Sequence, residues 1–374
     1  MIRYIIFLFL IVGCNTNSQL YDIKLVSDSI KKKYAPDSRV ALYDVKITSL
    51  NQSIIIKGET NILSAKKEII YHLESIKVEY YDSLDLLPNY KYKNGIVNNS
   101  VGNLRGKPSH SSELVSQAVL GTKLKILKRT GEWYMVQTPD NYISWIDHGG
   151  IKVMSDKNFD NYYLNNYVFS DVYGFSYETI NKEKIVSDLV LGSVLNVIDT
   201  ESNYYKIRYP DGRIGLVDIN SVISISSLHD NKKSESNLLE YALGLRGIPY
   251  LWGGTSTKGF DCSGFTKTVY MMNGLNIPRD ASQQINEGKL IDKERKWSKL
   301  TVGDLMFFGY YKNGRRRIDH VAMWIGDGKF IQASKNVRIN SVHSSSPIYD
   351  KYHMEKYIES RRIIGNETFG VKKL

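Results

Sequence analysis

The sequence predicts a multidomain protein with a small α+β domain first, two small β-barrels next and an α+β domain last. Three observations lead to this prediction. Residues 114–147 and 185–218 repeat one another, a polar and charged segment follows the repeat, and the final segment has helical patterns before strand patterns. A chain of 374 residues is long enough for about two to four domains.

The overall charge favours acidic partners. Lys and Arg exceed Asp and Glu, giving a formal net charge of +11, which suits an anionic membrane surface or acidic peptides. The basic residues are scattered along the chain, and no nucleic-acid-binding motif accompanies them. Nucleic acid is therefore not an expected partner.

Residues 1–14, MIRYIIFLFLIVGC, have the features of a signal peptide. Arg3 precedes an apolar run that is too short to span a bilayer. The end of the run resembles the lipobox of bacterial lipoproteins, which implies cleavage before a lipid-modified Cys14. The expectation is an exported lipoprotein, anchored to a membrane and facing the periplasm or cell envelope. An accidental cysteine in an ordinary signal peptide is the alternative.

A small α+β domain is expected over residues 21–98, after a polar tether. The apolar patterns predict, in order, a helix, two strands, a helix and a strand over Tyr21–Lys33, Val40–Thr48, Ser53–Glu59, Ala65–Leu73 and Ile76–Tyr80. Nothing in the segment indicates catalysis, so spacing or partner binding is its expected role.

The repeat predicts two similar β-rich domains, over residues 99–155 and 165–225. Residues 114–147 align without gaps on residues 185–218, with about a third of positions identical. Each copy consists of short alternating runs broken by Leu-Gly, by a second turn and by Pro-Asp. Short strands joined by tight turns favour small β-barrels. The pattern resembles bacterial SH3-like domains, which commonly accompany cell-wall enzymes.

A linker is expected over residues 226–236, and an α+β domain over residues 237–368. A helix over Leu238–Arg246 is followed by a helix that begins near Cys262 and then by strand patterns over 300–310, 319–334 and Lys356–Ile364. Helices followed by strands indicate helices packed on an antiparallel sheet.

Cys262 is the leading candidate for a nucleophile. It stands at a predicted helix start, between Asp261 and Ser263, where the helix dipole favours a thiolate. Cys14 is the only other cysteine. If Cys14 carries lipid, Cys262 is a free thiol in an exported protein, and catalysis is the best explanation for such a thiol.

His320 is the candidate base. Of the seven histidines, four precede the last domain, and His343 and His353 lie in a polar, loop-like stretch. His320 instead begins an alternating strand that is followed by a tight turn and a return strand containing Gln332. A three-residue loop over 326–328 would pair residue 322 with residue 332 and set Gln332 diagonal to His320 on one face.

DCSGF and HVAMWIGDGKFIQAS, with PYLWGG and PRDASQQ, resemble the NlpC/p60 family of papain-like cell-wall cysteine peptidases. The resemblance implies Cys262 as nucleophile, His320 as base and Gln332 as the residue that orients His320. Many family members have His at this third position, whereas Gln accepts a hydrogen bond but cannot ionise. Tyr250 matches a family tyrosine that helps to hold the oxyanion. Packing of Tyr250 and Trp252 against the Gly-Gly turn is the alternative reading of these two residues.

A narrower resemblance reaches upstream. Residues 103–117 and 139–145 are similar to the first SH3-like domain of the γ-D-glutamyl-L-diamino acid endopeptidases, also called dipeptidyl-peptidase VI. The resemblance implies that Glu113 and Tyr142 recognise the free amine of L-Ala, since a buried ammonium needs a carboxylate partner. It also implies substrate contacts by Trp252, Asp261, Ser263 and Asp280. Ala281 stands where some relatives have serine, and the second copy has Arg213 in place of Tyr142.

The implied activity is release of L-Ala-γ-D-Glu from peptidoglycan-derived peptides, by hydrolysis of the bond to L-Lys or diaminopimelate, in wall peptide recycling. An endopeptidase acting on intact stems and a non-catalytic wall-binding lipoprotein are the alternatives. No cofactor or metal is expected, because no Cys/His cluster has ligand spacing. The protein is expected to be a monomer.

Overall fold

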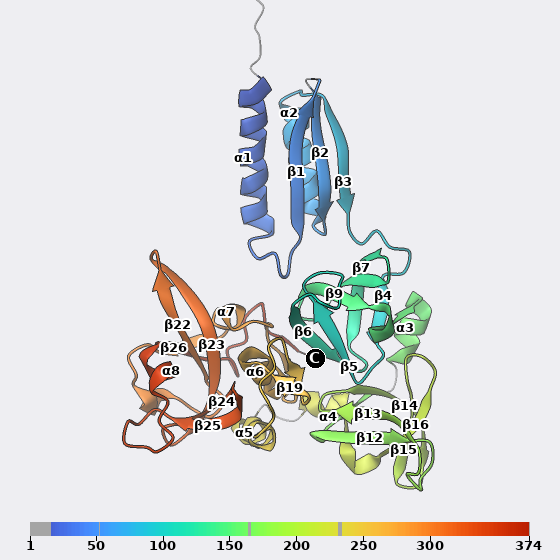
Figure 1. The fold of residues 1–374 in the computed structure, drawn as a ribbon, viewed down its shortest axis with the longest axis vertical. Helices are drawn as coiled ribbons and strands as arrows, with labels where there is room; N and C mark the ends of the chain where they lie inside the picture. Colours follow the sequence, from blue (N-terminus) through green and yellow to red (C-terminus); the bar gives the residue numbers. More distant parts are fainter. Residues whose placement is uncertain (1–15, 52, 164–165, 231–233, 374) are drawn as a thin grey trace, which may run out of the picture. The chain divides into compact units, whose positions relative to one another are not determined.

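The computed structural model describes residues 16–51, 53–163, 166–230 and 234–373. The signal peptide and lipidation site predicted for residues 1–14 lie outside these ranges. The chain forms two compact units, residues 1–89 and 90–374 (Figure 1). Within the described ranges, no helix has both the length and the apolar composition needed to cross a membrane.

The first unit is a three-stranded sheet with two helices. Its elements are α1 (Thr16–Tyr34), β1 (Tyr43–Leu50), β2 (Ser53–Thr60), α2 (Leu63–Ser75) and β3 (Tyr80–Leu86). β1 pairs antiparallel with β2, and β2 pairs parallel with β3. A parallel pair needs a crossover connection, which α2 supplies. Buried side chains of both helices and the sheet form one apolar core.

The last strand of this unit begins later than predicted. The sequence pattern predicts a strand over Ile76–Tyr80, but β3 runs over Tyr80–Leu86. Residues 76–79 instead complete the exit from α2, where Lys77 adopts a positive φ of 54° and the N–H of Ile76 caps the helix. The apolar residues Ile76 and Val78 therefore belong to the segment that leaves α2 and not to a strand.

The two repeats fold into two seven-stranded sheets of the same topology. The first copy contains β4 (Asn94–Val97), β5 (Val101–Arg105), β6 (Leu114–Val119), β7 (Lys123–Thr130), β8 (Trp133–Gln137), β9 (Ile143–Asp147) and, after η1 (His148–Gly150), β10 (Ile151–Met154). The second contains β11 (Asn166–Phe169), β12 (Tyr173–Tyr177), β13 (Ile185–Val190), β14 (Val194–Glu201), β15 (Tyr204–Arg208), β16 (Ile214–Asp218) and, after η2 (Ile219–Ser221), β17 (Val222–Ser224). The strand order is β10-β4-β7-β8-β9-β5-β6 in the first copy and its counterpart β17-β11-β14-β15-β16-β12-β13 in the second.

The repeated turns occur where the sequence predicts them. The second turn joins β7 to β8 through Gly131 and joins β14 to β15 through Ser202, both with positive φ. The Leu-Gly step places Gly121 and Gly192 at positive φ as well. A Cβ on Gly121 would lie 2.1 Å from the carbonyl oxygen of Val194, so this turn allows close approach of the second barrel.

Two predicted boundaries differ from the observed elements. β4 lies within the segment predicted as the N-terminal domain (21–98), yet it pairs with β7 and β10 of the first barrel. Residues 226–230 of the predicted linker (226–236) belong to α4 (Ile225–Asp230), which carries the buried residue Leu228, and residues 235–236 begin the next helix. The polar composition of the segment concealed α4.

The last domain packs helices on an antiparallel sheet, as predicted. Its helices are α5 (Glu235–Gly244), α6 (Cys262–Met271), α7 (Ala281–Gln284), η3 (Trp297–Lys299) and α8 (Lys351–Glu355). Its main strands are β21 (Lys289–Asp292), β22 (Leu305–Lys312), β23 (Arg315–Gly326), β24 (Lys329–Ser334), β25 (Asn336–Ser341) and β26 (Tyr357–Arg362), in the order β21-β26-β22-β23-β24-β25. Short strand pairs are β18 (Thr255–Ser256) with β19 (Gly259–Phe260) and β20 (Leu275–Asn276) with β27 (Lys372–Lys373).

The helix α6 occupies the centre of this domain. Phe265 and Val269 are fully buried, together with side chains of β22, β23 and β24. Eight residues of α6, including its first five, are buried. The start of α6 is therefore held firmly against the sheet.

The first barrel is joined to the last domain by buried polar contacts. The Thr255 hydroxyl donates to the carbonyl oxygen of Gln117 at 2.7 Å, and the N–H of Thr255 donates to the Gln117 side chain at 3.1 Å. The Lys267 ammonium of α6 lies 3.1 Å from the carboxylate of Asp140, whose side chain is 5% exposed. The barrel thus contacts the segments on both sides of Cys262.

Breaking the Asp140–Lys267 pair should destabilise the unit formed by residues 90–374. We expect Asp140→Asn to cost about 3 kcal/mol, because it leaves a buried ammonium without its carboxylate. The measurement is the thermal unfolding midpoint of the full chain. Glu178→Gln is the matched control, since the Glu178–Lys184 pair is 3.7 Å long and exposed and should contribute about 0–1 kcal/mol. Equal shifts in the two variants would contradict the prediction.

Candidate active site

Cys262 is the first residue of α6 and is 8% exposed. Asp261 is the N-cap, and its Oδ1 accepts a hydrogen bond from the N–H of Gly264 at 2.7 Å. Backbone N–H groups of Val321 and Ser263 donate to the sulfur. Because Val321 follows His320 on β23, the thiol lies beside the strand that carries the predicted base.

The thiol is neutral in this environment. Burial raises the pKa of Cys262 to about 12, and the charge of Asp261 acts in the same direction. The N–H groups of Val321 and Ser263 and the charge of Arg279 oppose this rise but are outweighed. Burial thus opposes the thiolate that is expected at a helix start. Ionisation requires a base that takes the proton.

Both oxygens of the Asp261 carboxylate accept hydrogen bonds from neighbouring groups. Oδ2 accepts from the Arg279 guanidinium at 2.5 Å and from the N–H of Gly253 at 3.0 Å. Oδ1 accepts from Arg279 at 3.1 Å and from the Ser263 hydroxyl at 3.3 Å, besides Gly264. These contacts hold the approach to α6 in place, and a direct substrate contact by Asp261 stays a prediction.

His320 and Gln332 face each other across β23 and β24. The imidazole Nε2 lies 2.6 Å from Oε1 of Gln332. His320 is 8% exposed and Gln332 is fully buried. An amide oxygen only accepts, so Nε2 carries the proton, and Nδ1 is left as the basic nitrogen.

The register of this hairpin is the predicted one, but its loop is not. Met323 pairs with Ile331, the register that sets residue 322 opposite residue 332. Gly326 pairs with Lys329, so the loop has two residues, Asp327 and Gly328, both at positive φ. A bulge between Trp324 and Gly326 restores the register, because one extra residue reverses the facing of the strand beyond it.

Burial, with a smaller contribution from the neighbouring His353, lowers the pKa of His320 to about 3. The hydrogen bond to Gln332 and the charge of Asp350 act in the opposite direction. The imidazole is therefore neutral, as a proton acceptor for the thiol must be.

Tyr250 and Trp252 lie on the approach to Cys262. Burial raises the pKa of Tyr250, and the proximity of Cys262 and Asp261 raises it further, which places its hydroxyl in the environment of the thiol. Trp252 is 63% exposed, and its indole Nε1 donates to Oε1 of Glu113 in the first barrel at 2.8 Å. The structure therefore brings Glu113 to the catalytic domain.

The remaining predicted substrate contacts are divided between two environments. Tyr142 is 7% exposed and lies near Arg279. Ser263 is buried and its hydroxyl accepts from Arg279 at 2.9 Å. Asp280 is the N-cap of α7 and forms a capping box with Gln283. Their roles toward substrate stay predictions.

Sequence reasoning missed three buried residues of the site. Arg279, 2% exposed, joins Asp261 and Ser263 of the catalytic domain to Ser116 of the barrel. His353, predicted to lie in a loop, is buried in α8 with its ring stacked 4.2 Å from that of His320. Asp350 is the N-cap of α8, and its spacing of three residues before His353 was the one available signal.

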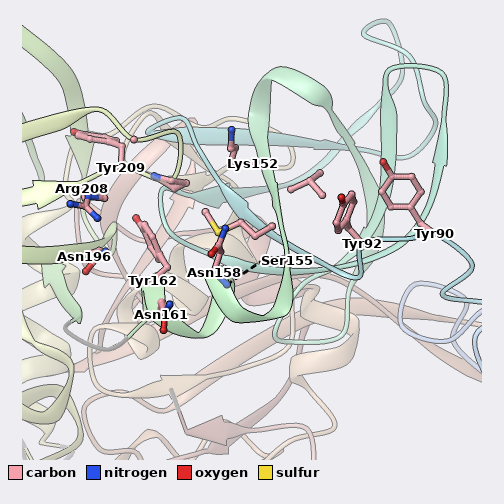
Figure 2. Close-up of a pocket in the computed structure, with 14 residues that line it drawn as sticks. Tyr90, Tyr92, Lys152, Ser155, Asn158, Asn161, Tyr162, Asn196, Arg208 and Tyr209 are labelled. Carbon is pink, nitrogen blue, oxygen red and sulfur yellow. Dashed lines mark hydrogen bonds between the residues drawn. The ribbon is translucent and has the colours of Figure 1, made fainter.

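A separate groove of about 780 Å³ lies between the two barrels (Figure 2). It is lined by residues of both repeats and the connecting helix α3 (Asp156–Tyr162), including Tyr90, Tyr92, Tyr162 and Tyr209. None of the predicted site residues lines it. Across the described part of the chain, no group of three His, Cys, Asp or Glu side chains is arranged to hold a metal ion.

Two segments of the chain match known domain families. Residues 247–362 match the NlpC/P60 family, and residues 100–152 match the bacterial SH3 domain. A "Gamma-D-glutamyl-L-lysine dipeptidyl-peptidase" of Bacillus cereus is 28% identical over 268 residues, which cover 68% of this chain and 77% of that protein. A "Dipeptidyl-peptidase 6" of Lysinibacillus sphaericus is 28% identical over 277 residues, covering 68% and 94%.

The fold also matches a solved structure. The crystal structure of an NlpC/P60 family protein from Bacillus cereus superposes with a TM-score of 0.60 at 24% identity. The match covers 72% of this chain and 99% of that chain. It supports the multidomain fold of barrels and catalytic domain.

Burial of a neutral His320 should make stability depend on pH. Its pKa is lower in the folded than in the unfolded state, so the unfolded chain binds the extra proton and stability falls as pH drops from about 6.5 toward about 3. We expect the wild type to lose about 2 kcal/mol between pH 7.5 and pH 5 through this group. Unfolding by urea at both pH values measures it, with His320→Gln as comparison. Equal losses in the two proteins would exclude the effect.

Proposed function

Because the chain is a cysteine peptidase with an NlpC/P60 domain over residues 247–362 and a bacterial SH3 domain over residues 100–152, we propose that it hydrolyses peptidoglycan-derived peptides with a free N-terminal amine. The products would be L-Ala-γ-D-Glu and a peptide that begins with L-Lys or diaminopimelate. The similarity to two dipeptidyl-peptidases extends over 77% and 94% of their lengths, and it supports the proposal.

In the proposed reaction, Cys262 is the nucleophile, His320 is the general base and Gln332 orients His320. Nδ1 of His320 takes the proton of the thiol, and the sulfur attacks the γ-carbonyl carbon of D-Glu. The imidazolium returns that proton to the leaving amine as the C–N bond breaks, leaving a thioester. Water, deprotonated by His320, then hydrolyses the thioester and frees the thiol. Gln332 accepts the Nε2–H hydrogen bond throughout.

The backbone N–H of Cys262 and the hydroxyl of Tyr250 are the proposed donors to the oxyanion. The hydroxyl of Tyr250 is held protonated by burial and by the nearby negative groups. A protonated phenol can donate a hydrogen bond where negative charge develops.

The observation that carries the substrate proposal is the hydrogen bond between Trp252 and Glu113, which brings a barrel carboxylate to the approach of the site. Oε1 of Glu113 accepts from the indole, and the Glu113 side chain is exposed, so that Oε2 is accessible to an approaching group. A carboxylate with an accessible oxygen can receive the ammonium of L-Ala. Acylation of that amine, as in glycan-linked stems, removes the charge and adds bulk.

We further propose that the protein is an exported lipoprotein anchored through Cys14 and acts in recycling of wall peptides. The lipobox-like end of residues 1–14 supports the anchor. An enzyme that requires free amines acts after other hydrolases have released stem peptides from the glycan. An envelope location would expose it to those products.

The first test compares free and acylated substrates. We expect the purified protein to cut L-Ala-γ-D-Glu-L-Lys, or its diaminopimelate counterpart, into the dipeptide and the diamino acid. The N-acetylated peptide should stay intact, and Cys262→Ala should be inactive on both. Mass spectrometry of the products gives the answer. Efficient cleavage of the N-acetylated peptide would instead support an endopeptidase of intact stems.

The second test concerns Glu113. Glu113→Gln should reduce kcat/KM for the free-amine tripeptide by about 10- to 100-fold, the effect of losing one hydrogen bond between charged groups. Glu132→Gln is the matched control, because Glu132 is an exposed carboxylate of the same barrel paired with Arg129. Steady-state kinetics on both variants should show the loss only at Glu113. An unchanged kcat/KM in Glu113→Gln would exclude its role in amine recognition.

A further inference from the structure

The amide of Gln332 is held from behind by two acceptors. Its Nε2 donates to Oδ2 of Asp350 at 2.7 Å and to Oδ1 of Asn340 at 2.9 Å. Asn340 in turn donates to the carbonyl oxygen of Ile348 at 3.2 Å, which directs its own oxygen toward Gln332. Both amide hydrogens of Gln332 are therefore used, and its oxygen must face His320.

A reversed amide would be strongly disfavoured. It would direct the oxygen of Gln332 at the carboxylate of Asp350 and its NH₂ group at Nε2 of His320. Nδ1 would then carry the proton and could no longer act as the proposed base. The orientation of one buried amide thus decides which nitrogen of His320 can act.

Asp350 supplies the charge in this arrangement. Burial alone would raise the pKa of its carboxyl, but hydrogen bonds from the His353 side chain and backbone and from Gln332 hold that pKa well below its usual range. Nδ1 of His353 lies 2.8 Å from the same Oδ2 that accepts from Gln332. The ring of His353 stacks on His320 at 4.2 Å and 30°. One carboxylate therefore fixes both the amide and the stacked ring.

We propose that Asp350 is a positioning residue of the catalytic machinery, acting through Gln332. It fixes the reactive tautomer of His320, and its negative charge stabilises the imidazolium that forms when His320 accepts the proton of Cys262. Gln332 carries no charge. The negative charge that the triad lacks is supplied by Asp350, which accepts a hydrogen bond from Gln332. His353 holds Asp350 and the plane of the His320 ring.

The charged and titratable groups around His320 come from three elements. Cys262 of α6 accepts from the backbone N–H of Val321, the residue after His320, and Arg338 on β25 lowers the pKa of His320. Asp350 and His353 come from the start and body of α8. Of these groups, Asp350 alone carries the negative charge that favours the imidazolium.

The inference rests on the proposed cysteine-peptidase mechanism. Its main test uses no peptide substrate, so that a failure of the inference can be distinguished from a failure of the proposed activity. The rate of Cys262 alkylation by iodoacetamide is measured against pH in the full chain. Loss of the anion makes the thiolate–imidazolium pair less favourable, so Asp350→Asn should shift the midpoint upward by about half a pH unit. In parallel, kcat/KM for the tripeptide should fall about 10- to 100-fold, as for other partners that orient a functional histidine.

Asp292→Asn is the matched control. Asp292 is 4% exposed in the same domain, and its carboxylate accepts from Tyr357 and from backbone N–H groups of residues 294–296. It should lose stability without a shift of the alkylation midpoint. Coincident alkylation profiles of Asp350→Asn and the wild type would overturn the proposal, whatever the peptide assay shows.

Two further variants keep the proposal testable if Asp350→Asn folds poorly. Asn340→Asp, at a partly exposed position, adds a carboxylate to the same amide and should shift the alkylation midpoint downward. Gln332→Glu places a second carboxylate against that of Asp350. In the double variant Gln332→Glu/Asp350→Asn, the amide of Asn at position 350 can donate a hydrogen bond to the new glutamate. The double variant should recover at least about 10-fold in kcat/KM over Gln332→Glu. A midpoint that Asn340→Asp leaves unchanged, or simple additivity in the double variant, would contradict the proposal.

Discussion

The buried pair between Asp261 and Arg279 is the interaction on which the rest of the site depends. The guanidinium and carboxylate are 2.5 Å apart, with side chains that are 1% and 10% exposed. The carboxylate caps α6 and holds the Gly253 turn, while the guanidinium reaches Ser116 of the first barrel. Buried charges are tolerated when they are paired and fully hydrogen-bonded. A single pair therefore connects the nucleophile, its approach loop and the neighbouring domain.

Around this pair, the reactive groups are kept neutral until they are used. Thiol and imidazole are both buried, which favours the uncharged form of each. In the proposed mechanism, charge separation between Cys262 and His320 then depends on fixed dipoles and on charged groups behind them. The N–H groups that face the sulfur and the amide of Gln332 are such dipoles. This arrangement combines a protected thiol with a base whose geometry is already set.

Much of the fold could be read from the sequence because it is encoded locally. The turns of the repeat, the helix start at Cys262 and the helix-then-sheet order all follow from short patterns. The sequence also predicts that His320 and Gln332 lie on the same face of the hairpin, on the assumption of a three-residue loop. The real hairpin has a two-residue loop and a bulge, and the two solutions give the same register. Pattern alone does not distinguish them.

What the sequence did not reveal depends on contacts between distant segments. Arg279 is an unremarkable cation until the barrel places Ser116 beside it. His353 follows Asp350 in a polar stretch, and only the sheet brings its ring against His320. The raised pKa of the Cys262 thiol has the same origin, because a helix start is a local feature whereas burial comes from packing against distant segments. Long-range packing decided each of these cases.

The Pro-Asp turn of the repeat has one more consequence. In the first barrel, Asp140 of this turn binds Lys267 of the catalytic domain. In the second barrel, Asp211 of the equivalent turn accepts from Asn98 of the first barrel, and Arg213 donates to the carbonyl oxygen of Asn98. The same turn thus has a different neighbour in each copy: the last domain for the first barrel, and the first barrel for the second. A substitution of this aspartate would therefore weaken a different interface in each copy, the one with the last domain at Asp140 and the one between the barrels at Asp211.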